Sequence, residues 1–139
     1  MTSKEYLKQI YFLTQAIEDE ESEIKMIQIC ADGMTGMGFD KEMIKDSIPV
    51  SGIETNYLKI EMLKEKIEKQ RGKLKQIKED ATKRIALMRN ERERKILKLK
   101  YFDFLSWEQI MSEFETDSKD AVYSLHRRAL SHFPMKHNI

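Results

Sequence analysis

The apolar residues near the start of the chain recur at alternating intervals of four and three positions. This stripe, interrupted only by Glu20, consists of Tyr6, Ile10, Leu13, Ile17, Ile24 and Ile27. Such spacing places the apolar side chains on one face of a helix that packs against another helix. It predicts a helix over residues 3–30, with the acidic run at 18–23 on the solvated face.

A second stripe repeats every seven residues and predicts a helix from residue 53 to about 89. Its members are Ile53, Ile60, Ile67, Leu74, Ala81 and Met88. The second position of this seam is weakened by Gln70 and Arg84. A long helix with one apolar stripe cannot bury that stripe alone. We expect it to pair with residues 3–30 in an antiparallel hairpin, with a second copy of itself, or with both.

Residues 31–52 separate the two predicted helices and differ from them in composition. Four of the five glycines and one of the two prolines fall there, and both residue types disfavour a helix. We expect a flexible linker with at most one helical turn, at 40–46. Residues 1–89 are therefore predicted to form a helical hairpin or coiled coil.

After Asn90 the heptad stops and three shorter helical patterns follow. The first, at 90–101, has a different apolar face. The second opens at Ser106, whose hydroxyl forms a predicted capping box with the side chain of Gln109. The buried side of this second helix is predicted to contain Trp107, Ile110, Met111 and Phe114.

The last helical pattern is capped by Ser118 or Asp117 and runs to about His132. Its predicted inward residues are Val122, Leu125, Ala129 and Phe133. Two short helices joined by a tight turn, after a third helix that closes the core, are the layout of a helix-turn-helix. The chain is thus predicted to be all-α, with a DNA-binding domain at 90–134 and a tail at 135–139.

The free face of the last helix predicts the DNA contacts. Lys119, Asp120 and Ser124 lie near its start and are predicted to reach base edges, since lysine donates to guanine and aspartate accepts from cytosine. The predicted phosphate contacts are Tyr123, Arg127 and Arg128, with Lys98 or Lys100 on the supporting helix. The alternative is that these are ordinary surface charges on a small helical bundle. Spacing alone leaves both interpretations open.

Charge and composition add modest support for a polyanionic partner. The net charge is +1, but residues 82–139 hold 12 basic and 8 acidic side chains, whereas residues 1–50 hold 5 and 10. A basic end can meet DNA. No apolar run approaches the roughly 20 residues of a membrane span. The single Cys30 can form no intrachain disulfide, so we expect a small buried residue in a cytoplasmic protein.

Nothing in the sequence predicts an enzyme. The three histidines, His126, His132 and His137, do not share a helical face with carboxylates at metal-ligand spacing. No trio of nucleophile, base and orienting group is visible. We therefore expect no metal and no cofactor, and we expect His126 to serve in packing or in a phosphate contact.

The order "ERKILKLKYFDFLSWEQI … VYSLHRRAL" resembles region 4 of bacterial sigma factors. The matching residues are Arg94, Leu97, Leu99, Lys100, Tyr101, Leu105, Ser106, Gln109, Ile110, Val122, Arg128, Ala129 and Leu130. With "KEYLKQIYFL" near its start, the chain is similar to small sigma-like proteins encoded by phages and integrated elements of Gram-positive bacteria. It departs from that pattern in the turn "FETDS", which lacks the usual glycine and is one residue longer.

The resemblance implies a sequence-specific transcriptional regulator that binds double-stranded promoter DNA of phage or mobile-element genes. It places the protein in the cytoplasm of a bacterial host, at the nucleoid, with host RNA polymerase as a further candidate partner. A region-4-like domain lacks the parts that melt a promoter, which favours an activator or accessory factor.

Two other functions are open from the sequence. Small terminase subunits also join a helix-turn-helix to oligomerising helices for DNA packaging, but they place the DNA-binding part first. A coiled-coil adaptor between proteins, with a degenerate helix-turn-helix, is the other alternative. In either case the coiled coil is a candidate homo-oligomer interface.

Overall fold

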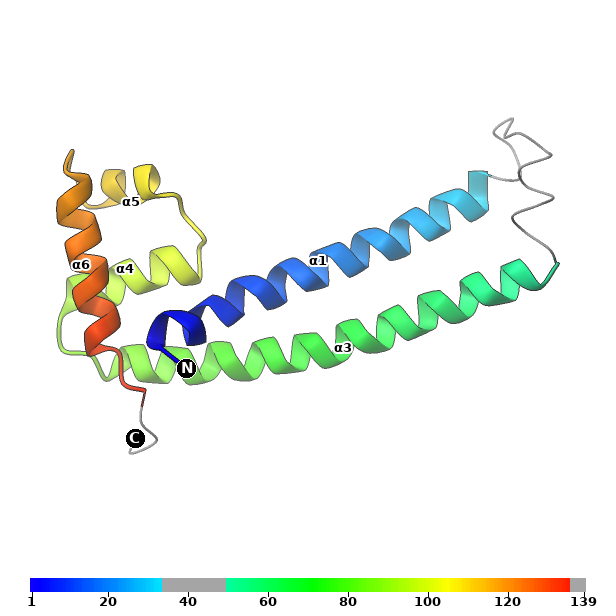
Figure 1. The fold of residues 1–139 in the computed structure, drawn as a ribbon, viewed down its shortest axis with the longest axis horizontal. Helices are drawn as coiled ribbons and strands as arrows, with labels where there is room; N and C mark the ends of the chain where they lie inside the picture. The colour runs from blue at the N-terminus through cyan, green and yellow to red at the C-terminus, as the bar shows by residue number, and fades with distance from the viewer. Residues whose placement is uncertain (34–49, 136–139) are drawn as a thin grey trace. The chain divides into compact units, whose positions relative to one another are not determined.

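The computed structural model describes the backbone of residues 1–33 and 50–135, and the side chains of residues 1–30 and 55–135. These residues form helices and no strand, which confirms the predicted all-α class. The helices are α1 (Ser3–Gly33), α3 (Val50–Ala86), α4 (Glu91–Tyr101), α5 (Trp107–Glu113) and α6 (Lys119–His132) (Figure 1). None of them is long and apolar enough to cross a membrane. Most of the predicted linker at 31–52 lies outside the described residues.

The chain divides into two compact units, each of which is described by itself. One unit combines Met1–Thr14 with Lys73–Ile139, so it holds the start of α1, the end of α3 and the three short helices. The other is Gln15–Gly72, with the remaining parts of α1 and α3. In the first unit, residues on both sides of position 89 share one hydrophobic core.

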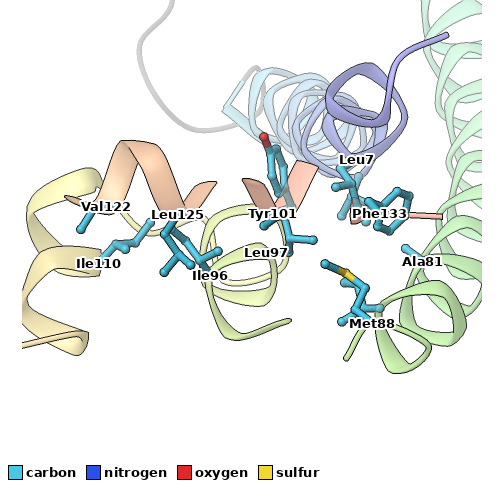
Figure 2. Packing of buried hydrophobic residues seen from close by; sticks show 13 residues of the cluster. Leu7, Ala81, Met88, Ile96, Leu97, Tyr101, Ile110, Val122, Leu125 and Phe133 are labelled. Atoms are coloured by element: carbon cyan, nitrogen blue, oxygen red, sulfur yellow. The ribbon is translucent and has the colours of Figure 1, made fainter. Parts of the chain in front are cut away.

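The core of the first unit is built around α4. Its buried members are Leu7, Ile10, Ala81, Ile85, Met88, Ile96, Leu97, Tyr101, Ile110, Val122, Leu125, Ala129 and Phe133. Figure 2 shows the α4 side chains in the middle of this cluster, with Ile110 and Val122 on one side and Leu7 and Met88 on the other. Burial of these apolar side chains away from water holds the start of α1 and the end of α3 to the three short helices.

Burial confirms some of the predicted faces and corrects others. The four inward residues predicted for α6 are all buried. Leu7 and Ile85 are also completely buried, although they lie outside the predicted stripes. The expectation of a buried Cys30 was wrong, because this thiol is exposed near the end of α1.

In the second unit, the two polar residues that interrupt the predicted apolar stripes, Glu20 and Gln70, contact each other. Ile17 and Ile67 are buried as predicted. Glu20 is buried as well, and its Oε1 lies 3.1 Å from Nζ of Lys66 and 3.4 Å from Nε2 of Gln70. A buried charge requires such partners. The residues that break the stripes in the sequence therefore meet across the α1–α3 contact, where Oε2 of Glu20 and Oε1 of Gln70 are buried without a hydrogen-bond partner in the described residues.

Each short helix begins at a residue whose side chain satisfies a free backbone N–H group. Asn90 accepts from the backbone N–H of Glu93 at 3.1 Å. Ser106 and Gln109 form the predicted capping box, with bonds of 3.2 and 2.9 Å. Ser118, one of the two predicted caps, accepts from the N–H of Ala121 at 3.1 Å. These bonds fix where the three helices start.

The turn between α5 and α6 closes without a glycine. The N–H of Thr116 donates to the carbonyl of Met111 at 3.0 Å, and the N–H of Glu115 donates to that of Ser112 at 3.1 Å. This is the hydrogen-bond pattern of a Schellman motif, whose left-handed position is usually glycine. Here Glu115 occupies it, with a φ of 53°. The missing glycine noted in the sequence therefore leaves a strained residue in the turn.

Replacing Glu115 by glycine is expected to stabilise the protein by about 0.5–1 kcal/mol. The left-handed conformation costs a non-glycine residue about 1–2 kcal/mol, and the greater freedom of glycine in the unfolded chain offsets about 0.5–1 kcal/mol of the gain. Urea unfolding followed by circular dichroism measures the difference. Glu115→Ala is the control, because it removes the carboxylate but keeps the Cβ. An equal gain in both variants would assign the effect to charge and not to backbone strain.

Candidate nucleic-acid interface

Helix α6 has one buried face and one exposed face. It packs against both α4 and α5, which also contact each other (Figure 1). Val122, Leu125 and Ala129 are turned into the core. The residues predicted to contact DNA are all exposed on this helix: Lys119, Asp120, Tyr123, Ser124, Arg127 and Arg128.

Most of these exposed side chains bind nothing else in the described part of the chain. The side chains of Lys119, Asp120 and Ser124 form no hydrogen bond or ion pair there, and the guanidinium groups of Arg127 and Arg128 form none either. Ser124 and the two arginines line a shallow hollow together with Ser131. Their donors and acceptors are therefore available to a ligand on this face.

Trp107, the first residue of α5, connects α4 to the side of α6. The Nζ atom of Lys100 lies 4.4 Å from the centre of the Trp107 ring, in a cation–π contact. The edge of Tyr123 meets the same indole at 5.0 Å between ring centres. Tyr123 is nevertheless 38% exposed. The tryptophan thus brings one predicted phosphate contact on α4 next to another on α6.

His126 is a packing residue. It is buried, with its ring stacked against Tyr101, and the Tyr101 hydroxyl lies 2.8 Å from Nε2. Burial, with smaller contributions from Lys4 and Lys100, lowers the pKa of His126 to about 4. Burial also raises the pKa of Tyr101 to about 12. At neutral pH the protonated hydroxyl can therefore donate to the uncharged imidazole, and no charge is available for a phosphate.

The two lysines predicted on the supporting helix occupy different environments. Lys100 is partly buried beside Trp107, and its pKa is lowered by burial and then by the nearby charges of Lys8 and Lys4. Lys98 is exposed on α4, and no contact in the described residues joins its side chain to α6. Lys100 is therefore connected to Tyr123 of α6 through the ring of Trp107, whereas Lys98 has no such connection in the described residues.

The end of α6 is attached to the rest of its unit by two hydrogen bonds. Nδ1 of His132 lies 2.7 Å from Oε1 of Glu93, whose side chain is only 4% exposed. The hydroxyl of Ser3 donates to the carbonyl of Leu130 at 2.8 Å. Together with the core, these bonds attach α6 to α4 and to the start of α1.

Sequence reasoning missed the contribution of the first helix to this region. Lys4 and Lys8 are close enough to act electrostatically on Lys100, and Lys4 also acts on His126. Their spacing of four residues on a face separate from the apolar stripe was visible in the sequence. Only the fold shows that this face lies near α4, because the contact joins residues about ninety positions apart in the chain.

The side chains of residues 1–30 and 55–135 contain no group of three or more histidine, cysteine or carboxylate residues placed to hold a metal ion. The exposed α6 face, with its unpaired polar groups, is the candidate site. No curated protein and no solved structure is significantly similar to the chain. One family matches residues 50–133, which include α3 and all three short helices. The chain therefore belongs to the family described as "Protein of unknown function (DUF1492)".

Proposed function

We propose that the protein is a sequence-specific DNA-binding regulator of phage or mobile-element genes. The observation that carries this proposal is the exposed face of α6. It presents a lysine, an aspartate, a serine and two arginines that have no partner in the described residues, while the opposite face is buried. A helix that is fixed on one side and offers unpaired polar groups on the other is suited to the major groove.

In this proposal α5, the following turn and α6 act as a helix-turn-helix, with α4 as the supporting helix. Lys119, Asp120 and Ser124, near the start of α6, read base edges. Arg127 and Arg128 bind phosphates and set the register of the helix on the duplex. Lys100 and Tyr123, joined through Trp107, form a second phosphate-binding element at the side of α6. Lys98 is a more distant phosphate contact.

The resemblance to sigma region 4 extends this proposal to promoters. The matching residues Leu97, Tyr101 and Ile110 lie in the core, and Ser106 with Gln109 caps α5. These positions support the arrangement of helices that the resemblance implies. We propose an activator or accessory factor that binds promoter DNA, with host RNA polymerase as a candidate partner. In this proposal, the long helices α1 and α3 provide the homo-oligomer interface.

The test is selection of DNA fragments from the host and element genome by the full chain, at low and moderate salt. Wild type is expected to enrich fragments upstream of a gene block. Lys119→Ala is expected to relax sequence choice, at a cost of about 1–3 kcal/mol for the preferred site. Arg127→Ala is expected to weaken all sites alike and to reduce the slope of log K against log salt by about 0.9.

Lys73→Ala is the matched control, because it removes one exposed positive charge from α3, away from the short helices. It should leave both the enriched sequences and the salt slope unchanged. The absence of enrichment at every salt concentration would falsify direct DNA recognition by the isolated chain. Equal losses in all three variants would assign binding to net charge and not to the α6 face.

A further inference from the structure

A cleft separate from the exposed face of α6 lies between the start of α1 and the end of α4. Its volume is about 360 Å³. The lining residues are Lys8, Tyr11, Phe12, Lys100, Tyr101 and Phe104. All of them belong to the same compact unit. The cleft therefore combines two lysines with four aromatic side chains on a fixed part of the fold.

Two of the four aromatic residues that line this cleft are exposed, whereas Tyr101 is buried. Phe12 is 60% exposed and Tyr11 is 44% exposed. The Tyr11 ring meets Phe104 edge-on at 5.4 Å and Phe12 at 5.8 Å between ring centres. Large apolar side chains clustered on a surface are typical of an interaction site. Because the rings meet edge to face, they line an apolar cleft. They do not form a row of parallel ring faces.

The charge of the cleft is unbalanced. Lys8 and Lys100 line it, Lys4 lies one helical turn before Lys8, and none of the three forms an ion pair with a described residue. No carboxylate is among the lining residues. Mutual repulsion contributes to the lowered pKa of Lys100, after burial. A ligand with negative charge would relieve this repulsion.

The backbone at Phe104, which follows the end of α4, is left-handed like that at Glu115. Its φ is 55°, a left-handed conformation that favours glycine and is rare for an aromatic residue. The turn around it is closed by a bond of 3.0 Å from the N–H of Leu105 to the carbonyl of Leu99. Strained residues concentrate at binding sites, where the side chain serves a purpose that glycine cannot. Here the ring of Phe104 forms one wall of the cleft.

We propose that this cleft docks an acidic peptide segment of a partner protein, with one apolar side chain of the segment inserted between Tyr11, Phe12 and Phe104. The carboxylates of the segment pair with the three lysines. The cleft is too small for a DNA duplex, and the edge-on rings offer no continuous platform for stacked bases. An acidic peptide with one apolar side chain complements both the positive charge and the apolar walls of the cleft. The docking uses no residue of α6, and it shares only Lys100 with the proposed DNA contacts.

The experiment selects binders for the full chain from a library of random short peptides. A Lys8→Glu/Phe12→Ser double variant is used for counter-selection. Both residues are exposed, so the variant should fold, and circular dichroism verifies this. The expected result is enrichment of peptides that combine several carboxylates with one large apolar residue. In fluorescence anisotropy, their Kd should rise at least about tenfold in each single variant and rise further with salt.

Lys59→Glu and Leu58→Ser are the matched controls, because Leu58 is also 60% exposed but lies on α3 in the other unit. They should leave the Kd unchanged. Phe104→Gly, which relieves the backbone strain, should also lose the peptide. DNA selection on the Phe12→Ser variant separates this proposal from the proposed function. Phe12 carries no charge and lies outside α4, α5 and α6, so this variant should retain DNA binding.

Several results would overturn the proposal. One is a selected set without enrichment of carboxylates, or with affinity that the cleft variants do not change. Another is binding of single-stranded oligothymidine that depends on Lys8 and Phe12 while no peptide is selected, which would make the cleft a nucleic-acid site. A third is a dimer in sedimentation that both cleft variants dissociate, which would make the occupant a second copy of the chain.

Discussion

Acidification from pH 7 to pH 4 is expected to remove about 3 kcal/mol of folding free energy through His126 alone. In the folded protein, burial lowers the pKa of this imidazole to about 4, whereas an unfolded chain has a histidine pKa of about 6.5. Between pH 4 and pH 6.5, the His126 imidazole is mostly protonated in the unfolded chain but mostly neutral in the folded chain. The contribution is therefore complete above pH 6.5 and is lost as the pH falls, at up to about 1.4 kcal/mol per pH unit.

The measurement is urea unfolding at a series of pH values, for wild type and His126→Gln. Glutamine can keep an acceptor near the hydroxyl of Tyr101, whose buried side chain needs a partner, but it does not titrate. The variant will be less stable at pH 7, because the ring also packs against Trp107. The stability difference between the two proteins should shrink by about 3 kcal/mol toward pH 4.

A change of pH also acts on the other ionisable groups of the chain. They contribute to both proteins and therefore cancel in the difference. A difference that stays constant from pH 7 to pH 4 would contradict a buried, neutral His126. It would also remove the reason to exclude this residue from phosphate binding.

The sequence predicted the parts of the fold that local rules control. The capping box of Ser106 and Gln109 was predictable because both bonds form within four residues of chain. The inward face of α6 was predictable because helical periodicity determines which side chains share a face. The bounds of α3 were predicted three residues too late at both ends, since periodicity does not determine where a helix stops.

The sequence did not predict features that depend on contacts between distant segments. Leu7 and Ile85 lie beside the apolar stripes, and they are buried because the three short helices cover the end of the α1–α3 contact. For the candidate site, the exposed residues of α6 were predicted. The approach of Lys4 and Lys8 to Lys100 was not, because it follows from the docking of α1 on α4. The left-handed conformation of Glu115 was indicated in the sequence only by the absence of a glycine from the turn.

At Arg84 the heptad pattern did not predict the burial that the structure shows. In the sequence Arg84 weakens the apolar seam of α3, yet its side chain is only 5% exposed. Its Nε lies 2.7 Å from the carboxylate of Asp80, and its Nη1 donates to the carbonyl of Pro134 at 2.7 Å. The guanidinium also lies 5.4 Å from the ring centre of Tyr6. Arg84 thus connects α3 to the start of α1 and to the segment after α6.

Tyr6 and Asp80 make this connection a network. The Tyr6 hydroxyl donates to the Asp80 carboxylate that also accepts from Arg84. Burial and the bond to Asp80 raise the pKa of Tyr6 to about 12, so the phenol remains protonated and keeps donating. The planar guanidinium can hold two acceptors in a fixed geometry, which a lysine ammonium cannot. The network therefore depends on arginine and not merely on positive charge.

Arg84→Met is expected to destabilise the protein by about 3 kcal/mol in urea unfolding. Methionine keeps the length and the apolar contacts of the side chain but loses both hydrogen bonds, and charged hydrogen bonds contribute about 1.5–3 kcal/mol each. The loss stays below the sum, because the side chain of Asp80 is 45% exposed and can be rehydrated. Arg84→Lys should lose about half as much, because it keeps one of the two contacts.

Arg89→Ala is the control, since this neighbouring arginine is exposed and has no partner in the described residues. It should change stability by less than about 0.5 kcal/mol. Replacing a buried ion pair by apolar residues is neutral in some proteins, because the charges must be desolvated. An Arg84→Met variant as stable as wild type would show that replacing the ion pair is neutral in this chain as well. It would also show that apolar burial around Leu7 and Ile85, and not the Arg84 network, holds α1 to the core.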